Sequence, residues 1–247
     1  MCNLYSVRTS RAALAREFLL SDNRMAAFEP LSAIFPGGMA PIIKQSADGE
    51  RELVLRSWGF ILLRDGYAPK RVTNTRDDKL TTNFWRESFE RRRCLVPATS
   101  FCEPDGNKPC QWHWFARTGD GPRPLFAFPG IYRTWKGPIK KGGPNVDVEV
   151  FSFITTLPNA LTSTINHERS PVLLAGEDEY SAWLNGTPND ALSVIKTSAP
   201  ERMRIVQAGL DKKDFWASPV DGSLQIQPPA PATQLSIVTT GARAEGA

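Results

Sequence analysis

The sequence predicts an α+β fold built as a single β-rich domain. Most apolar segments are rich in Val, Ile, Phe and Thr and are separated by turns that contain Pro or Gly, a pattern typical of β-strands. Helical spacing of apolar residues appears only in short stretches, and no internal repeat is visible. A chain of 247 residues is also long enough for one large domain to bury a substantial core.

The expected elements can be placed in chain order. A helix is expected from about Ser10 to Leu20, with Ser10 as its N-cap, because a Ser stands directly before a run with helical spacing. The other expected elements are strands at Glu52–Leu63, Arg93–Phe101, Leu125–Tyr132 and Val148–Thr156, short helices around Glu177–Leu184 and Asn189–Ile195, and a late strand at Met203–Gln207.

The last part of the chain differs in composition. From about Gly222 it turns to Pro, Ala, Gln and Gly, and such segments bury too little apolar surface to fold. We therefore expect a folded domain over residues 1–222 and a flexible tail over residues 223–247.

Composition and charge narrow the function classes only in part. The longest apolar runs are far too short to span a bilayer, and no early stretch has the pattern of a secretion signal, so we expect a cytoplasmic protein without a membrane partner. Lys and Arg outnumber Asp and Glu by 30 to 26, giving a net charge of +4. This mild excess is compatible with nucleic-acid binding and equally with many enzymes.

The cysteines do not have the spacing of a metal site. Cys94, Cys102 and Cys110 recur every eight residues, which matches no close-paired zinc-ligand spacing, and only His113 and His167 could add imidazole ligands. Disulfides are not expected in a cytoplasmic protein. We therefore expect no metal, and we expect Cys94 and Cys102 to be buried strand residues.

Cys2 follows the initiator Met directly, and removal of Met1 would make Cys2 the N-terminal residue. It would then carry an α-amine with a reference pKa of about 7.7–8.0 and a thiol with a reference pKa of about 8.5 on adjacent carbons. Together these groups can capture an aldehyde, because the amine forms an imine and the thiolate closes a five-membered thiazolidine ring. The alternative is that Cys2 is only the residue that happens to follow the start codon.

Several segments in the same order resemble the SOS response-associated peptidase (SRAP) family, whose domain protects abasic sites in DNA. These segments span roughly residues 2–184 and include Met1-Cys2-Asn3-Leu4-Tyr5-Ser6, Val72-Thr73-Asn74-Thr75-Arg76, Asn83-Phe84-Trp85-Arg86, Arg93-Cys94-Leu95-Val96-Pro97-Ala98, Phe101-Cys102-Glu103, Phe128-Pro129-Gly130-Ile131-Tyr132, Phe153-Ile154-Thr155-Thr156, and Asn166-His167-Glu168-Arg169 followed by Ser170-Pro171-Val172-Leu173-Leu174. The resemblance implies a mostly antiparallel, curved sheet with a few short helices.

By the same resemblance, Cys2 is the nucleophile that forms a crosslink with an abasic site. Glu103 would assist the proton transfers of sugar ring opening and imine formation. The alternative interpretation of Glu103 is a salt-bridged residue on the surface. His167 would exchange a proton with the sugar hydroxyl and help to reverse the crosslink. Asn74 would hold the Cys2 amine or backbone, although alone it would be interpreted as a turn residue. His113 stands between two tryptophans and is better explained by packing.

The resemblance also suggests residues that contact DNA. Arg76, Arg86 and Arg169 are the candidates for phosphate contacts, since guanidinium groups suit phosphate oxygens. Trp58 or Trp85 could stack on a base, an interaction worth roughly 1–3 kcal/mol, and core packing is the alternative for each.

The sequence departs from the family pattern at four places. Asn3-Leu4 replaces a frequent Gly-Arg and so removes one phosphate-contacting Arg, Pro104 replaces a frequent Trp, and Ser170 stands where Met is common. The Trp58-Gly59-Phe60 segment lacks the usual Pro and Trp that follow. These changes bear on the DNA contacts more than on the chemistry.

The resulting functional hypothesis is a monomeric, nucleoid-associated protein that binds single-stranded DNA and forms a thiazolidine crosslink to abasic sites through Cys2, without a cofactor. Self-removal of Met1 would be its peptidase-like step. One alternative is a cysteine peptidase or amidase in which Cys2 is the nucleophile and His167 the base. Another is a non-catalytic binding module, for which Cys2→Ala would leave function intact.

Overall fold

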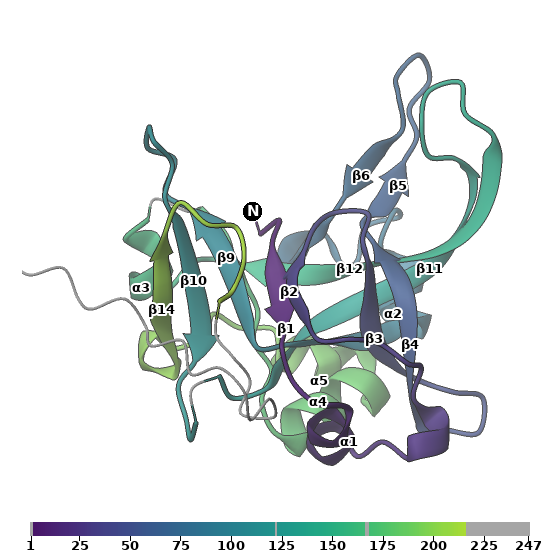
Figure 1. Ribbon diagram of the computed structural model, residues 1–247. Helices are drawn as coiled ribbons and strands as arrows, with labels where there is room; N and C mark the ends of the chain where they lie inside the picture. Colours follow the sequence, from purple (N-terminus) through teal and green to yellow (C-terminus); the bar gives the residue numbers. More distant parts are fainter. Residues whose placement is uncertain (1, 122, 166–167, 216–247) are drawn as a thin grey trace, which may run out of the picture.

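Two sheets make up most of the computed structural model, which describes residues 2–121, 123–165 and 168–215. The five-stranded sheet has the order β14-β10-β9-β1-β2, and all its neighbouring strands are antiparallel (Figure 1). Its strands are β1 (Tyr5–Val7), β2 (Leu31–Ile34), β9 (Ser100–Pro104), β10 (Trp112–Arg117) and β14 (Met203–Gly209). This sheet carries the beginning of the chain and hence positions Cys2.

The second sheet is strongly curved. Its order is β11-β8-β3-β4-β12-β13, and β11 also pairs with β12, so the sheet curls back on itself. The strands are β3 (Met39–Gln45), β4 (Arg51–Trp58), β7 (Asn74–Arg76), β8 (Arg93–Ala98), β11 (Phe126–Pro138), β12 (Asn145–Thr156) and β13 (Ser170–Pro171). The parallel pairings between described strands are those of β12 with β4 and of β12 with β7. The predicted β-rich α+β fold with a mostly antiparallel, curved sheet is confirmed.

The helices are short and lie outside the sheets. They are α1 (Arg11–Phe18), α2 (Arg86–Arg91), α3 (Ala160–Ser163), α4 (Glu177–Asn185) and α5 (Pro188–Ser193), with 3-10 turns at Asp22–Arg24, Asp77–Lys79 and Pro200–Arg202. The first expected helix is confirmed, including its cap, because the Ser10 side chain accepts a hydrogen bond from the Ala13 amide. No helix among the described residues is long and apolar enough to cross a membrane.

Two predicted strands are each interrupted. The strand expected over Glu52–Leu63 breaks at Gly59, whose φ of +108° ends β4 and starts the separate hairpin of β5 (Phe60–Leu62) and β6 (Lys70–Val72). The strand expected over Arg93–Phe101 breaks at Thr99, where the chain passes from the curved sheet into the five-stranded sheet. The expected tail boundary after residue 222 lies outside the described residues and stays a prediction.

An aromatic cluster joins the two sheets. Tyr5 of β1 makes edge-to-face contacts with Trp58, Phe128 and Phe153 of the curved sheet, at ring-centroid distances of 5.1, 5.7 and 5.9 Å. All four rings are fully buried. Cys94 and Cys102 are also buried on β8 and β9, as expected. The strand that leads from Cys2 is therefore anchored in the centre of the core.

A buried carboxylate also holds β1. Asp214 accepts hydrogen bonds from the hydroxyls of Ser6 and Ser100 at 2.9 and 2.5 Å. It also pairs with Arg123 at 2.7 Å, and both side chains are nearly inaccessible to solvent. The Asp214 backbone carbonyl accepts a further bond from Arg8. Asp214, near the end of the described chain, thus links β1 to β9 through hydrogen bonds.

Replacing Asp214 by alanine is expected to lower the free energy of unfolding by about 3–5 kcal/mol, since it removes the carboxylate opposite the buried Arg123 guanidinium. Chemical denaturation of wild type and variant measures this loss. Asp211→Ala is the matched control because Asp211 is exposed in the same segment. Equal stabilities of Asp214→Ala and wild type would show that this network does not hold β1.

Candidate functional site

Cys2 lies at the entrance to β1, close to β9. The Leu4 carbonyl accepts a hydrogen bond from the Cys102 amide at 2.8 Å, which ties this segment to β9. The Cys2 side chain is fully buried, and its thiol donates to the Leu4 carbonyl at 3.4 Å. Burial, and then the negative charge of Glu103, raises the pKa of the Cys2 thiol well above its ordinary value. The resting thiol is therefore protonated and needs a proton acceptor before it can react.

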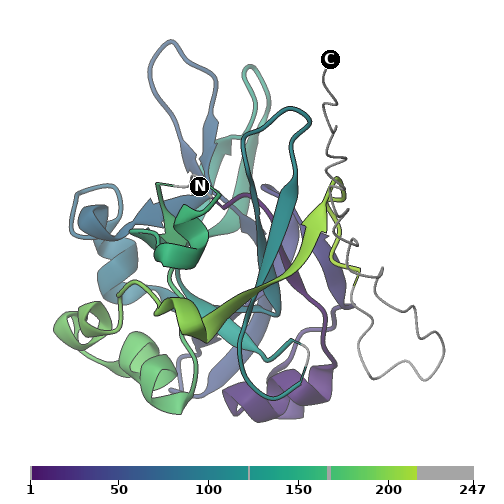
Figure 2. The ribbon, with the colours of Figure 1, turned by 90° about the vertical axis from the view of Figure 1, so that its left-hand side faces the viewer.

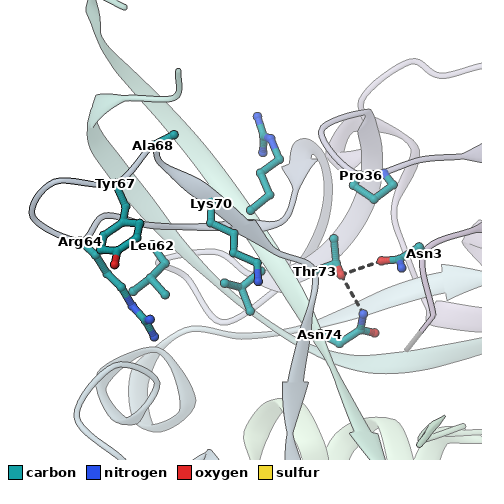
Figure 3. Close-up of a pocket in the computed structure, with 11 residues that line it drawn as sticks. Asn3, Pro36, Leu62, Arg64, Tyr67, Ala68, Lys70, Thr73 and Asn74 are labelled. Carbon is teal, nitrogen blue, oxygen red and sulfur yellow. Dashed lines mark hydrogen bonds between the residues drawn. The ribbon is translucent and has the colours of Figure 1, made fainter. Parts of the chain in front are cut away.

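Asn74 holds the backbone of Cys2. Its side-chain amide donates to the Cys2 carbonyl at 2.7 Å and to the Thr73 hydroxyl at 2.8 Å. The Thr73 hydroxyl in turn donates to the Asn3 side chain at 3.0 Å (Figure 3). Asn74 is itself fixed because β7 pairs with β12, with Asn74 opposite Phe153. Residues far apart in the chain thus set the position of residues 2 and 3.

Glu103 is buried and not on the surface, so the surface alternative from the sequence does not hold. It lies on β9 with only 1% of its surface exposed, and burial raises the pKa of its carboxyl to about 8. The carboxyl therefore carries a proton over much of the neutral range. A group of this kind can act as a general acid towards a leaving hydroxyl and, once ionised, as a base towards a thiol.

A cavity of about 680 Å³ opens next to this network. Asn3, Thr73 and Asn74 form one side, and the β5–β6 hairpin forms the other (Figure 3). The hairpin and the turn before β3 supply the remaining lining residues, which are Pro36, Leu62, Arg64, Tyr67, Ala68, Lys70, Arg71 and Val72. The charged residues among them are all cations, so the cavity suits an anionic ligand.

Two of the three cavity cations, Arg64 and Lys70, are available for a ligand, whereas Arg71 is held by hydrogen bonds to the protein. Within the described residues, none of Arg64, Lys70 and Arg71 forms an ion pair with a carboxylate. Arg71 packs across Gly59 and donates to the Gly59 carbonyl at 3.2 Å and to the Ser57 hydroxyl at 3.2 Å. The sequence analysis missed these three residues, although three cations within eight positions just before Thr73-Asn74 could have indicated them.

The arginines predicted from the sequence do not line this cavity. Arg76 pairs with Asp78, and Arg169 pairs with Asp77, so a phosphate would have to compete with a carboxylate at each. Both lie at the same end of β12, which pairs with β7 and β13 there. Arg86 is exposed and donates to the Thr81 carbonyl and the Asn83 side chain. Its guanidinium therefore has no carboxylate competitor among the described residues.

Trp58 and Trp85 occupy the core, which was the alternative for each. Trp58 is fully buried, stacks on Phe153 and donates its indole N–H to the Thr73 carbonyl at 3.0 Å. Trp85 is 8% exposed and stacks on Phe60. Trp58 has no exposed face to offer a base, so its suggested stacking role needs correction, whereas stacking by Trp85, which keeps some exposed surface, stays a prediction. The exposed ring beside the cavity is Tyr67, at 74% exposure.

His167 lies outside the described residues, so its position beside Cys2 stays a prediction. No group of three or more His, Cys, Asp or Glu side chains that could hold a metal ion occurs among the described residues. The candidate site thus consists of a buried thiol, a buried carboxyl and a cation-lined cavity, connected by Asn3, Thr73 and Asn74.

Comparison with known proteins adds a family and a fold. A sequence model of the family described as SOS response associated peptidase (SRAP) matches residues 1–211. A solved structure from Bordetella bronchiseptica has a TM-score of 0.63 at 19% identity, covering 84% of this chain and 98% of that chain. One from Bacteroides thetaiotaomicron has a TM-score of 0.63 at 23% identity, with coverage of 84% and 90%. A phage-related protein from Bordetella bronchiseptica has a TM-score of 0.61 at 20% identity, with coverage of 82% and 92%. These three structures share the fold.

Proposed function

The chain belongs to the SOS response-associated peptidase (SRAP) family, and on that premise we propose that it binds single-stranded DNA and forms a covalent thiazolidine crosslink with abasic sites through Cys2. The family links the chain to the response to DNA damage. The observation that carries the finer proposal is the position of Cys2, which is buried beside Glu103 and joined through Asn74 to a cavity lined by cations.

The proposed reaction begins after hydrolysis of the Met1–Cys2 peptide bond, which frees the Cys2 amine. The amine adds to C1′ of the open-chain abasic sugar, and the resulting hydroxyl leaves as water when it takes a proton from Glu103. Loss of this water leaves a protonated imine. Ionised Glu103 then accepts and keeps the proton of the Cys2 thiol while Sγ bonds to the same carbon, and the nitrogen retains the one proton it already carries as the ring N–H. One water is lost in total, no electron transfer occurs, and Glu103 ends the cycle protonated.

The state of the resting site supports this sequence of steps. A raised pKa of Glu103 supplies a protonated carboxyl for the first step, and a raised pKa of Cys2 keeps the thiol from reacting before the imine is present. The bond from Asn74 to the Cys2 carbonyl does not involve Met1, so it can hold residue 2 before and after processing.

Two basic hairpins support binding of a phosphate backbone. The β5–β6 hairpin (residues 60–72) has three cations and one carboxylate, and the β11–β12 hairpin (residues 133–149) has four cations and two carboxylates. Their combined charge of +4 equals the formal net charge of the whole chain. The hairpins project side by side from the body, and Arg133 donates to the Ile61 carbonyl at 2.8 Å where they meet (Figures 1 and 2). Both hairpins thus carry a net positive charge, and the β5–β6 hairpin lines the cavity.

Removing cavity cations is expected to weaken binding of a single-stranded oligonucleotide and to reduce its salt dependence. For Arg64→Ala/Lys70→Ala, the slope of log affinity against log salt should decrease in magnitude by about 0.7 for each phosphate that the variant no longer neutralises. Fluorescence anisotropy at several salt concentrations measures this slope. Arg16→Ala/Lys196→Ala removes the same charge from exposed residues outside the cavity and is the matched control. Equal slopes for the two double variants would place the phosphates elsewhere.

The proposed function is tested with the processed protein, whose loss of Met1 is first verified by mass. It is mixed with an oligonucleotide carrying one abasic site, with an undamaged oligonucleotide, and with one whose abasic site has been reduced with borohydride and has no aldehyde. We expect a band that survives denaturation with the first oligonucleotide alone, and an adduct mass equal to protein plus DNA less one water. No such band would contradict the proposal and favour hydrolysis of a peptide or small amide.

A further inference from the structure

Asn3 connects the nucleophile to the cavity. It follows Cys2 directly, it is exposed, and it lines the cavity together with Arg64 and Lys70 (Figure 3). The next residue, Leu4, is buried in a separate apolar cluster and is not part of the cavity lining. Asn3 is therefore the side chain through which the start of the chain can meet a ligand in the cavity.

Three hydrogen bonds determine which atom of the Asn3 side chain is free. The Cys2 carbonyl can only accept a hydrogen bond, so the Asn74 atom that lies 2.7 Å from it is the amide nitrogen. The same nitrogen gives its second hydrogen to the Thr73 hydroxyl at 2.8 Å, and that hydroxyl donates its own hydrogen to Asn3 Oδ1 at 3.0 Å. Asn3 Oδ1 is thus already engaged. Asn3 Nδ2 keeps its hydrogens for a ligand, since it donates to no described residue.

This free amide lies where a phosphate of the proposed substrate has to pass. Ring closure brings C1′ of the abasic sugar to the amine and Sγ of Cys2. The phosphates on either side of that sugar then lie beside residue 3, whose Cα is about 3.8 Å from the Cα of residue 2. Asn side chains are among the groups that donate hydrogen bonds to phosphate oxygens. An ionised phosphate only accepts, so it matches the free Nδ2 group of Asn3.

We propose that Asn3 is a substrate-binding residue whose Nδ2 group donates a hydrogen bond to a phosphate next to the abasic sugar. The inference rests on the proposed crosslinking function. Thr73 holds Asn3 Oδ1, and Asn74 holds both Thr73 and the Cys2 carbonyl. The phosphate is therefore fixed relative to the nucleophile by one continuous network. Asn3 thereby sets the register in which the strand presents its abasic sugar to Cys2.

The test combines a change in the protein with a change in the DNA, using the processed full-length protein and an oligonucleotide with one reduced abasic site. A methylphosphonate on the 5′ or the 3′ side of the abasic sugar replaces one charged phosphate oxygen by a methyl group. Asn3→Ala should weaken binding of the unmodified oligonucleotide about 5-fold or more, because a hydrogen bond to a charged group is lost. At the contacted linkage, methylphosphonate should weaken binding of wild type by a larger factor than binding of Asn3→Ala. Fluorescence anisotropy measures all four affinities.

Two further variants separate this contact from the effects of charge and of folding. Asn3→Asp retains the acceptor for Thr73 and loses the donor, so it should bind at least as weakly as Asn3→Ala and show the same insensitivity to methylphosphonate. Asn3 is uncharged, so Asn3→Ala should leave the slope of log affinity against log salt unchanged, in contrast to Arg64→Ala/Lys70→Ala. Asn185→Ala removes an exposed asparagine outside the cavity and is the matched control, with wild-type binding expected.

The outcomes separate this inference from the proposed function. If methylphosphonate at each linkage weakens wild type and Asn3→Ala by the same factor, the phosphate contact is wrong, and the crosslinking function stands as long as wild type forms the covalent product. If Asn3→Ala melts well below wild type, the same comparison with Asn3→Asp decides. If wild type forms no covalent product with abasic DNA, the proposed function fails and the assigned register fails with it.

Discussion

Replacing Cys2 by alanine is expected to abolish the stable covalent product with abasic DNA, while affinity for an oligonucleotide with a reduced abasic site changes by about twofold or less. The Cys2 thiol is fully buried and does not belong to the cations that line the cavity, so it contributes little to phosphate binding. The bond from Asn74 reaches the carbonyl of residue 2, which the substitution retains. Denaturing gels measure the covalent product, and anisotropy measures the affinity.

The same variant separates the two bond-forming steps. Cys2→Ala keeps the α-amine after removal of Met1, so it can still form an imine but cannot close the ring. A covalent band should therefore appear for this variant only when borohydride is added to reduce the imine. Cys110→Ala removes a partly exposed thiol and is the matched control, with wild-type crosslinking expected. A stable band for Cys2→Ala without borohydride would show that another residue is the nucleophile.

Replacing Glu103 by glutamine is expected to lower the crosslinking rate about 10²- to 10⁴-fold, the usual contribution of a positioned acid–base group. The pH dependence should also change. In wild type the rate rises as the amine loses its proton at about pH 8, and it falls again as Glu103 loses its own proton with a pKa of about 8. Glutamine cannot ionise, so the decrease on the alkaline side should disappear. Initial rates at a series of pH values measure both effects.

Glu103→Gln is also expected to stabilise the fold above neutral pH. The folded carboxyl has a pKa of about 8 against an ordinary value of 4.5, so between these values the folded state binds more protons than the unfolded state. Stability from this group therefore decreases as pH rises through that window, by about 1.4 kcal/mol per pH unit. The stability of the variant relative to wild type should increase from about pH 5 to about pH 8 and then level off.

The control for both measurements is Glu90→Gln, since Glu90 is exposed on α2 and its substitution should change neither rate nor stability appreciably. Chemical denaturation at several pH values gives the free energies of unfolding. A stability difference between Glu103→Gln and wild type that does not depend on pH would show that the Glu103 carboxyl is ionised in the folded protein. In that case the carboxyl could act only as a base in the proposed reaction.

The elements that sequence patterns located well are those formed by local interactions. The helix at Arg11–Phe18 depends on the Ser10 cap and on spacing within a few residues, and β12 depends on a continuous run of strand-forming residues. Short strands such as β1 and β2 were missed because only their partners in the sheet stabilise them. The breaks at Gly59 and Thr99 were missed for the same reason, since each marks a change of sheet partner.

By itself, the sequence determined the α+β class, the order of the family motifs and the position of Cys2 directly after Met1. Only the tertiary structure decided that Glu103 is buried, which raises the pKa of its carboxyl to about 8. It also decided that Arg76 and Arg169 pair with aspartates, and that Arg64, Lys70 and Arg71 face Asn3 across a cavity. The physical reason is that a pattern along the chain reports interactions between near neighbours. The pKa of a carboxyl, the partner of a guanidinium and the lining of a cavity depend on residues brought together from distant positions by the pairing of strands.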